Sequence, residues 1–315
     1  MALSDFGEDS PPIGWLQEDH ALSNYSFLFP FERWPGRVEY ARWQYEHWWI
    51  SLWGVAAYVL FVFAGQKAMR RRREFELRTA CVVWNASAAV FSLLGFWRSS
   101  HELFRVLHRH GFEHSVCVSS YIQDSVFCFW IKAFIVSKFF DFVDTVFLVL
   151  RKRPVSFLHW YHHATVLVFC WHGAKTLTAA GRWFAWMNYG VHLVIYTYFA
   201  VRTYGWACPK WVSMCVTCVQ MGQMVTGCWI GYTVYSVKAA GLPCHQTRAN
   251  LYMAVAIYST FLLLFAHYFY VNYVANGGKR ARARTRSEHT TTRLARTDND
   301  LVRNRLNRSA ISEAG

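Results

Sequence analysis

The chain has 315 residues, of which 54% are hydrophobic, 18% aromatic and 17% charged. A soluble chain of this length would hold about two domains and about 25% charged residues. Acidic residues are especially scarce, since only Asp141 and Asp144 occur between Ser125 and Ser287. No water-soluble surface of that length is so poor in carboxylates. The composition therefore excludes a disordered chain, a disulfide-stapled miniprotein and an ordinary cytosolic enzyme, and it predicts an all-α polytopic membrane protein.

Seven apolar segments qualify as candidate membrane-spanning helices. A bilayer core about 30 Å thick needs roughly 20 apolar residues in a helix, and Trp and Tyr gather at the ends of these segments, as they do at membrane interfaces. No proline interrupts any of them. The segments are 48–65, 80–96, 126–149, 157–171, 183–201, 211–235 and 252–274. The sequence thus predicts seven transmembrane helices.

The distribution of Lys and Arg predicts the orientation. Residues 1–30 are acidic and contain no continuous apolar stretch, so no signal peptide is expected there. With the N-terminus in the lumen, 21 Lys and Arg residues fall on the cytosolic side and ten on the lumenal side. Positive charge concentrates on the cytosolic side of membrane proteins. We therefore expect a lumenal N-terminus and a cytosolic C-terminus.

This topology divides the chain into a lumenal segment, residues 1–47, a transmembrane domain, residues 48–274, and a basic cytosolic tail, residues 275–315. The tail is rich in Arg, Thr and Asn, a composition that predicts disorder. Topology signals and this tail account for most of the net charge of +14. Attraction to the lipid bilayer through anionic headgroups is a secondary effect, and no nucleic-acid partner is expected.

Two features of the expected lumenal side concern covalent modification. Asn24 begins an Asn-Tyr-Ser glycosylation sequon. Cys117 and Cys244 both fall in lumenal loops, where a disulfide could persist, but the sequence leaves open whether they pair. Cys215 and Cys218 lie at helical spacing inside apolar sequence, which favours packing over metal binding.

The third span carries ionisable residues, which are costly in a bilayer and are functional candidates for that reason. Offsets of three and seven residues place Lys138, Asp141 and Thr145 on one helical stripe, with Asp144 alongside. Lys138 and Asp141 can pair at this spacing. The alternative to a functional site is a self-neutralising ion pair that only holds helices together.

The fourth span opens with His159-Trp-Tyr-His162-His163. His159 and His162 share a face, and His163 lies about 100° further round the helix. Three imidazoles within one and a half turns of an apolar helix are hard to explain as packing. By contrast His108, His110 and His114 are expected to be solvated in a lumenal loop, and the remaining single histidines look ordinary.

Polar stripes recur in the next two spans. The fifth contains Asn188, His192 and Tyr196 at steps of four residues, and the sixth contains Thr217, Gln220 and Gln223 at steps of three. Lipid would not tolerate these groups on an outer face. We therefore expect four consecutive spans to converge on a shared interior site.

Two function classes other than acyl transfer have to be considered. A membrane di-iron desaturase or hydroxylase uses HxxHH boxes, but it needs about eight histidines in clusters on one side of the membrane. Here the only other close cluster, His110 and His114, is expected on the opposite side, so no metal site is predicted. A seven-span receptor or transporter would fit the topology but does not require an imidazole cluster at one end of a helix.

Acyl transfer suits the constellation better. A neutral imidazole can attack a thioester or act as general base near neutral pH. The carboxamides of Asn188 and Gln220 can stabilise an oxyanion or enolate. Lys138, Arg151 and Lys152 lie where the phosphates of coenzyme A would arrive from the cytosol. No dinucleotide loop, P-loop or GxSxG elbow occurs, so no cofactor is expected.

The ordered motifs resemble those of the ELO fatty acid elongases, over residues from about 48 to 274. The box beginning at His159 is the family's HxxHH, and the segment from Lys138 resembles KxxExxDT with Asp141 in place of Glu. His192 begins a segment similar to HxxMY, with Ile195 for Met, and Thr217 begins TxxQxxQ. Asp141 is one methylene shorter than the family's Glu, whereas Ile195 is expected to alter packing only.

This resemblance implies condensation of a long-chain acyl-CoA with malonyl-CoA, in a fold of seven helices of which six enclose an acyl tunnel open to the cytosol. It implies that His162 is the nucleophile that forms an acyl-imidazole, or else only a base, and that His192 assists decarboxylation of malonyl-CoA. His159 and His163 would orient or polarise, and Asn188 and Gln220 would donate to a carbonyl. The residues expected to bind substrate are Lys138, Asp141, Asp144, Arg151, Lys152, Tyr196 and Gln223.

The resemblance also implies a setting. Such enzymes are multi-pass proteins of the endoplasmic reticulum membrane, and their partners are the ketoacyl reductase, dehydratase and enoyl reductase of the elongation cycle. Trp160 and Tyr161 inside the histidine box resemble the branch that handles saturated and monounsaturated chains. Chain length depends on how deep the tunnel runs, and the sequence does not show this.

Overall fold

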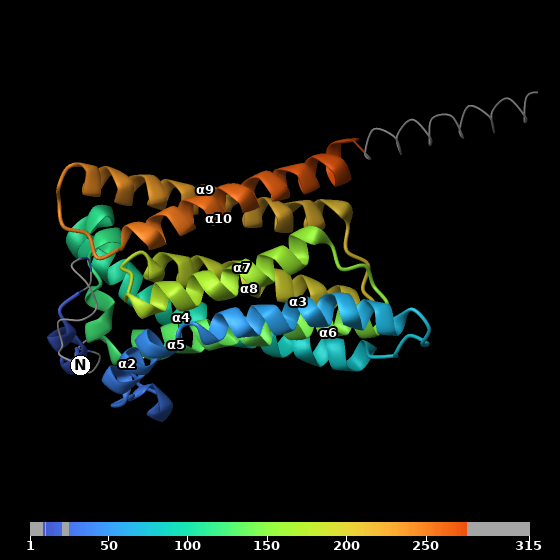
Figure 1. Ribbon diagram of the computed structural model, residues 1–315, viewed down its shortest axis with the longest axis horizontal. Helices are drawn as coiled ribbons and strands as arrows, with labels where there is room; N and C mark the ends of the chain where they lie inside the picture. Colours follow the sequence, from blue (N-terminus) through green and yellow to red (C-terminus); the bar gives the residue numbers. More distant parts are fainter. Residues whose placement is uncertain (1–8, 10, 21–24, 276–315) are drawn as a thin grey trace, which may run out of the picture. The chain divides into compact units, whose positions relative to one another are not determined.

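The computed structural model describes residues 9, 11–20 and 25–275, and these residues form helices and loops without any β-strand (Figure 1). The α-helices are α2 (Arg37–His47), α3 (Ile50–Met69), α4 (Arg78–Cys117), α5 (Ser125–Phe140), α6 (Phe142–Leu150), α7 (Phe157–Lys175), α8 (Gly181–Tyr204), α9 (Lys210–Ala239) and α10 (Arg248–Phe269). Short 3₁₀ turns cover Ile13–Gln17, Pro30–Glu32 and Ser120–Gln123, and a π-helical turn covers Tyr270–Ala275. The predicted all-α class is confirmed.

The chain divides into two compact units, Met1–Phe265 and Ala266–Gly315. The candidate site lies within the first unit. The division into segments 1–47, 48–274 and 275–315 stays a prediction. The predicted glycosylation site Asn24 and residues 276–315 of the predicted tail lie outside the described residues.

Among the described residues, three helices are long and apolar enough to cross a membrane: α3, α4, and α10 together with the turn that follows it. The helices α7, α8 and α9 have 19, 24 and 30 residues, but they carry the polar residues discussed above, which lower their mean hydropathy. The predicted third span is divided at Asp141 into α5 and α6. The count of seven spans therefore stays a prediction.

Helix α4 is much longer than the predicted span 80–96. It continues to Cys117 with a kink at Gly111, whose φ of 80° is a conformation that glycine adopts readily. The expectation that His108, His110 and His114 lie in a loop is wrong. The helix extends because its buried polar residues find partners outside it, as described below.

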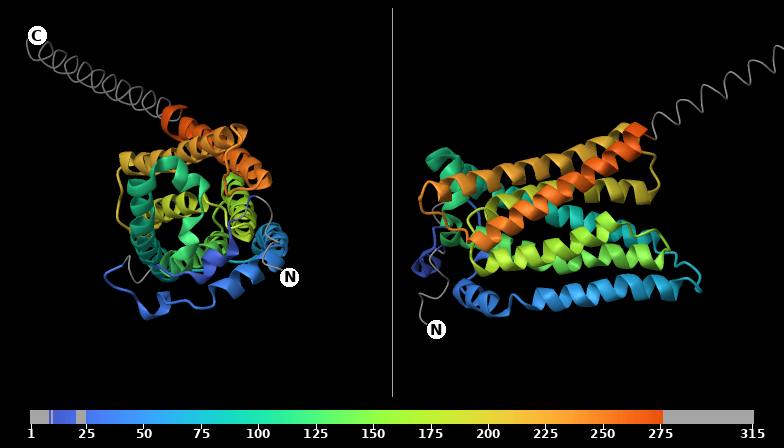
Figure 2. Two further views of the ribbon diagram at one scale, coloured as in Figure 1. Left: turned by 90° about the vertical axis from the view of Figure 1, so that its left-hand side faces the viewer. Right: turned by 45° about the horizontal axis from the view of Figure 1, so that its top comes forward.

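Helices α4 and α8 form the most extensive packing contact in the first unit. Gly95 of α4 lets the ring of Tyr189 approach so closely that a Cβ would lie 2.4 Å from it, and Gly190 of α8 similarly accepts Phe96. Helix α3 packs on α7, and α9 and α10 lie side by side (Figure 2), where Gly227 accepts the ring of Tyr258.

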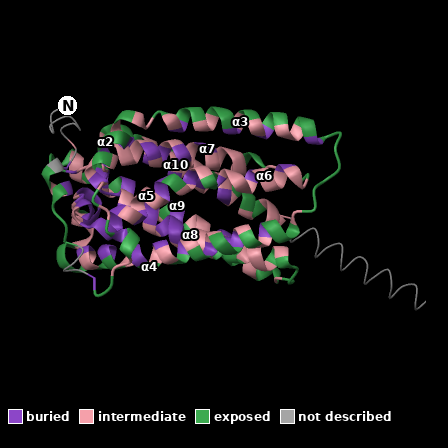
Figure 3. Cartoon of the chain, turned by 90° about the horizontal axis from the view of Figure 1, so that it is seen from below, coloured by how far each residue is buried: buried purple, intermediate pink, exposed green. Residues whose placement is uncertain are grey.

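Polar and apolar residues are distributed as a membrane protein requires. Exposed residues lie on the outward faces of the helices (Figure 3). Large apolar side chains are among the exposed residues, including Trp53, Leu60 and Trp229. Buried inside are charged and polar residues such as Lys138 and Asn188. Apolar surfaces outside and polar groups inside match a bilayer as solvent.

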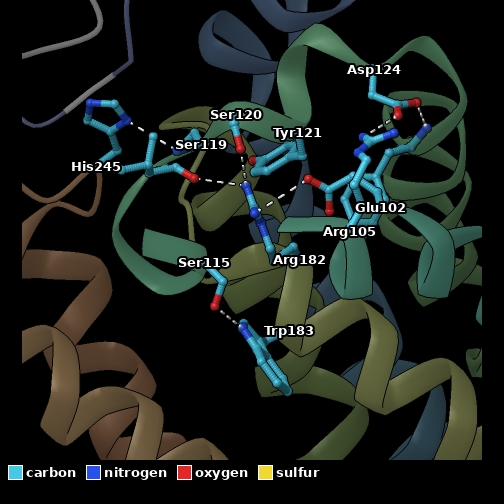
Figure 4. Close-up of polar contacts among 12 residues, drawn as sticks. Glu102, Arg105, Ser115, Ser119, Ser120, Tyr121, Asp124, Arg182, Trp183 and His245 are labelled. Carbon is cyan, nitrogen blue, oxygen red and sulfur yellow. Dashed lines mark hydrogen bonds and ion pairs between the residues drawn. The ribbon is translucent and has the colours of Figure 1, made fainter. Parts of the chain in front are cut away.

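A network of buried polar contacts closes one end of the first unit (Figure 4). We call it the disulfide end because Cys117 and Cys244 are joined there. Arg182 of α8 lies 3.4 Å from the carboxylate of Glu102 in α4, and Arg105 pairs with Asp124 at 3.1 Å. Arg182 also donates to the Val118 carbonyl and the Ser120 hydroxyl, and the backbone N–H of Ser119 donates to His245 Nδ1. The opposite end, with loops 70–77 and 151–156, we call the basic end.

Candidate active site

The ammonium group of Lys138 is the centre of the interior polar site. Its Nζ lies 2.9 Å from Asp141 Oδ2, the pairing that their spacing predicts, and also 2.9 Å from Asn188 Oδ1 on α8. Its side chain is only 2% exposed. A buried cation needs both a counter-charge and further hydrogen bonds, because the free energy of desolvation can exceed the attraction within the ion pair alone. Lys138 therefore links α5 to α8 at the point where α5 ends.

Asp144 is held by two donors from different helices. Trp84 Nε1 of α4 donates to its Oδ1 at 2.6 Å, and the Tyr196 hydroxyl of α8 donates to its Oδ2 at 2.8 Å. Both carboxylate oxygens are thus hydrogen-bonded, which fixes the orientation of the side chain. Asp144 thereby connects α4, α6 and α8, and its hydrogen bonds hold these three helices together beside the site.

The histidine box begins α7 through a local cap. Ser156 Oγ accepts the backbone N–H of His159 at 3.2 Å, a typical N-cap bond. His159 Nε2 then lies 2.9 Å from the hydroxyl of Thr145, which in turn lies 2.9 Å from the hydroxyl of Tyr58 on α3. This chain of polar groups fixes the His159 ring from α6 and α3.

The other two imidazoles of the box lie close by, in tilted and edge-on arrangements. The ring centre of His163 lies 4.3 Å from that of His159 and 5.4 Å from that of His162. His163 Nδ1 is buried without a hydrogen-bond partner among the described residues. The His162 ring lies 4.9 Å from the ring of Phe261 on α10, whereas the His192 ring packs 5.3 Å from Tyr196.

His162 of α7 and His192 of α8 belong to the same site. Each is close enough to Lys138 and Asp141 to interact electrostatically with both, and the two imidazoles interact electrostatically with each other. The residues from the predicted third, fourth and fifth spans therefore come together in the interior of the first unit.

A cavity of about 400 Å³ lies beside Lys138, Asp141 and His192, whereas the three histidines of the box, His159, His162 and His163, do not line it. Its polar wall contains Lys138, Asp141, Asn188, His192 and Tyr196, and the rest of its lining, from α4, α5 and α8, is mostly apolar. Ligand pockets are typically apolar with a few convergent polar groups and begin at about 300 Å³. The arrangement suits an apolar molecule with one polar reactive group.

The remaining predicted residues lie away from this cavity. Gln223 of α9 hydrogen-bonds Tyr258 of α10, and Gln220 is half-buried on α9. Neither lines the cavity. At the basic end, Arg151 Nη1 lies 3.5 Å from Cys81 Sγ, and Lys152 donates to the carbonyls of Arg70 and Arg72.

Three residues of the site escaped the sequence analysis. Tyr58, Trp84 and Phe261 contact Thr145, Asp144 and His162, respectively. Each belongs to no motif and lies in an apolar span that contains several other aromatic residues. No spacing pattern distinguishes them from packing residues. Within the described part of the chain, no group of three His, Cys, Asp or Glu side chains is arranged to hold a metal ion.

Comparisons with known proteins identify the family. The family model described as "ELO: GNS1/SUR4 family" matches residues 43–281. The chain belongs to the ELO family. It is 44% identical over 262 residues to the putative fatty acid elongase 3 of Caenorhabditis elegans, covering 82% of each chain. It is 41% identical over 262 residues to the very long chain fatty acid elongase 6 of Drosophila melanogaster, covering 82% of this chain and 83% of the relative.

The human very long chain fatty acid elongase 6 is also similar, at 36% identity over 255 residues, which is 81% of this chain and 96% of that protein. The resemblance drawn from the four motifs is confirmed. As an ELO protein with apolar helices that can cross a membrane, the chain is an enzyme of fatty acid elongation in a membrane.

Proposed function

We propose that this elongase condenses a long-chain acyl-CoA with malonyl-CoA. An imidazole nitrogen of His162 attacks the thioester carbonyl, the C–S bond breaks, and coenzyme A leaves with a proton. Malonyl-CoA loses carbon dioxide, and the resulting enolate carbon attacks the acyl-imidazole and breaks its C–N bond. The released imidazolate of His162 takes up one proton from water and becomes neutral again. The products are coenzyme A, carbon dioxide and a 3-oxoacyl-CoA two carbons longer than the acyl substrate.

The observation that carries this proposal is the position of His192, which lines the cavity together with Lys138 and Asp141 and interacts electrostatically with His162 of α7. One imidazole is available to hold the acyl group, and the other lies beside the cavity to assist decarboxylation or to position the enolate. His159 is oriented by Thr145, and His163 polarises its neighbours. The two half-reactions thus use imidazoles from different helices.

Asn188 suits the role of carbonyl donor because its own oxygen is already engaged. The Lys138 ammonium donates to Asn188 Oδ1. This bond orients the side chain, so its Nδ2 is the group left to donate to an oxyanion in the cavity. Gln220 of α9 is the second candidate carbonyl donor, and we assign Gln223 and Tyr196 to substrate binding; of these three residues, Tyr196 lines the cavity.

Coenzyme A binds at the basic end in this proposal. Lys152 fixes loop 70–77 through two backbone carbonyls, and the side chains of Arg70–Arg73 remain exposed beside it. Arg151 and this arginine cluster would bind the coenzyme A phosphates. With that end cytosolic, the disulfide end is lumenal and Asn24 is available for glycosylation.

The remaining expectations belong to the same proposal. Seven helices, counting α5 and α6 as one, span the endoplasmic reticulum membrane, and six of them surround the acyl tunnel. The substrates are saturated or monounsaturated chains, and the reductases and dehydratase of the elongation cycle consume the product. No cofactor beyond the two CoA substrates takes part.

Purified protein in lipid nanodiscs, supplied with acyl-CoAs of graded length and labelled malonyl-CoA, tests the proposal. We expect labelled 3-oxoacyl-CoA from the wild type and none from His162→Ala. His110→Ala, which changes an exposed histidine at the disulfide end, is the matched control and should keep full activity. Full activity in His162→Ala would overturn the assignment of the nucleophile.

The same assay separates the covalent route from the alternatives. Mass spectrometry of enzyme incubated with acyl-CoA alone should show the acyl mass on the peptide that contains His162. Turnover with no such adduct would assign His162 as a base. Loss of turnover on iron chelation that added iron restores would instead support oxygenase chemistry.

A further inference from the structure

The cavity beside Lys138 is bounded on one side by a gap between α4 and α5. Four small residues of these two helices line the cavity: Ser87 and Ala88 on α4, and Ala133 and Ser137 on α5. Small side chains leave space between helices that larger ones would fill.

Side-chain contacts cross from α4 on either side of this gap. Toward the basic end, Trp84 donates a hydrogen bond to Asp144 of α6, the helix that directly follows α5. Toward the disulfide end, the rings of Phe91 and Trp130 pack with their centres 6.1 Å apart. The small residues lie between these two contacts along both helices, so the gap has defined limits.

The gap reaches the outer surface of the first unit. Val136 is 36% exposed and Phe140 is 57% exposed, yet both line the cavity. Ser87 on the opposite helix is also both exposed and cavity-lining. We call the opening formed by Ser87, Ala88, Ala133, Val136, Ser137 and Phe140 the lateral window.

The lateral window changes character from rim to floor. Its rim carries the apolar side chains of Val136 and Phe140, whereas its floor carries Lys138, Asn188 and His192. In a membrane protein the rim of such an opening faces lipid. An amphiphile with a long alkyl chain and one polar carbonyl group matches this sequence of surfaces.

We propose that the alkyl chain of the acyl thioester passes sideways between the bilayer and the active site through the lateral window. This inference rests on the proposed function, because it assigns a route to the same substrate. The alkyl chain then never crosses water, which disfavours every methylene group, while the thioester carbonyl reaches the Lys138–Asn188 wall. The CoA moiety stays at the basic end.

A matched pair of variants on α4 tests the route. Ala88 lines the cavity, and Ala86 is exposed on the opposite face of the same helix. In nanodiscs we expect Ala88→Trp to raise the KM for palmitoyl-CoA by about tenfold or more, since the indole fills the window. Ala86→Trp should stay within about twofold of the wild type. Equal KM values for the two folded variants would overturn the proposal that the alkyl chain passes through the lateral window.

A second measurement uses the unaltered protein and so does not depend on whether a variant folds. A palmitoyl-CoA analogue with a diazirine in its alkyl chain is photolysed in nanodiscs, and the adducts are located by peptide mass spectrometry. Adducts on the window residues of α4 and α5 support the route. Adducts confined to other helices overturn it.

The two proposals fail in distinguishable ways. If the wild type forms no 3-oxoacyl-CoA, the proposed function fails, whatever the position of the photo-adducts. If the wild type elongates while Ala88→Trp and Ala86→Trp behave alike, condensation stands and only the lateral route is lost.

Discussion

Lys138 Nζ donates to Asn188 Oδ1 over 2.9 Å and thereby joins α5 to α8 inside the candidate active site. The same ammonium also neutralises Asp141. One side chain thus orients an amide and compensates a buried carboxylate. The stability of the fold and the activity both depend on Lys138 Nζ, but substituting Lys138 alone and together with Asp141 separates the two effects.

We expect Lys138→Met to destabilise the protein by about 3–5 kcal/mol, because it leaves the carboxylate of Asp141 buried without a counter-charge. The double variant Lys138→Met/Asp141→Leu should recover most of that loss but no activity, since Asn188 is no longer oriented. Unfolding in detergent and the elongation assay measure the two effects.

Lys132→Met is the matched control on the same helix. Lys132 lies over the Trp34 ring with its Nζ 4.1 Å from the centroid, so its loss should cost only about 0.5–1 kcal/mol. A Lys138→Met protein as stable as Lys132→Met would contradict the role of the ion pair.

The sequence predicted the interior site where its signal was local. Lys138 and Asp141 are three residues apart, so helical geometry alone brings these two side chains together. In the same way, the five-residue histidine box brings its three imidazoles together within one helix. The cavity and the gap between α4 and α5 depend on how helices distant in sequence pack. A periodic pattern in one helix carries no information about such packing.

The polar network at the disulfide end shows the same limit. Glu102 and Arg182 are 80 positions apart, and neither belongs to a repeating stripe. The predicted span 80–96 ends before Arg98 and Glu102, so it left both residues outside the membrane-spanning helix. Their partners, Glu32 for Arg98 and Arg182 for Glu102, only become visible in the folded chain.

Arg182→Met should destabilise the protein by about 3–5 kcal/mol, since Glu102, only 1% exposed, would lose its counter-charge. Arg182→Met/Glu102→Gln should recover part of the loss. Arg202→Met, which removes an exposed arginine from the same helix, should change stability by about 0.5 kcal/mol or less. Denaturant unfolding of the four proteins forms the test, and a double variant no more stable than Arg182→Met would refute the coupling.

The disulfide closes a long loop, since Cys117 and Cys244 are 127 positions apart. Constraining so long a loop in the unfolded chain stabilises the fold by up to about 5 kcal/mol. We therefore expect Cys244→Ser to lower the unfolding midpoint clearly, and reducing agent to have the same effect on the wild type but none on the variant. Cys215→Ser, at an exposed free cysteine, should match the wild type.

His245 makes the disulfide end sensitive to pH. Burial lowers the pKa of its imidazole, Asp9 opposes this shift and Lys238 adds to it. Since the unfolded imidazole titrates near pH 6.5, the unfolded chain binds the proton more readily than the folded one. The stability that neutral His245 contributes is complete above about pH 6.5 and is lost as the pH falls through the folded pKa.

His245 Nδ1 accepts the Ser119 N–H, and a protonated ring cannot accept it. Thermal unfolding between about pH 8 and pH 5 should therefore show a smaller loss of stability in His245→Gln than in the wild type. His108→Gln, at an exposed histidine of α4, should follow the wild type. Coincident profiles of stability against pH for the wild type and His245→Gln would exclude His245 as the source of the pH dependence.

Phe134 separates two cavities, the one of about 400 Å³ beside Lys138 and a smaller one of about 50 Å³ that extends toward Asn250 at the disulfide end. It lines both. If the alkyl chain lies in the larger cavity, the Phe134 ring limits how far the chain can extend. Removing the ring should join the cavities.

We accordingly expect Phe134→Ala to shift the products toward longer chains, by one or more two-carbon additions, at a cost of about 3–5 kcal/mol in stability. Phe139→Ala removes a neighbouring ring that lines neither cavity and should leave the product lengths unchanged. Chromatography of products from graded acyl-CoAs measures the shift. An unchanged length distribution in an active Phe134→Ala protein would show that another residue ends the acyl site, because the ring would then have no contact with the chain terminus.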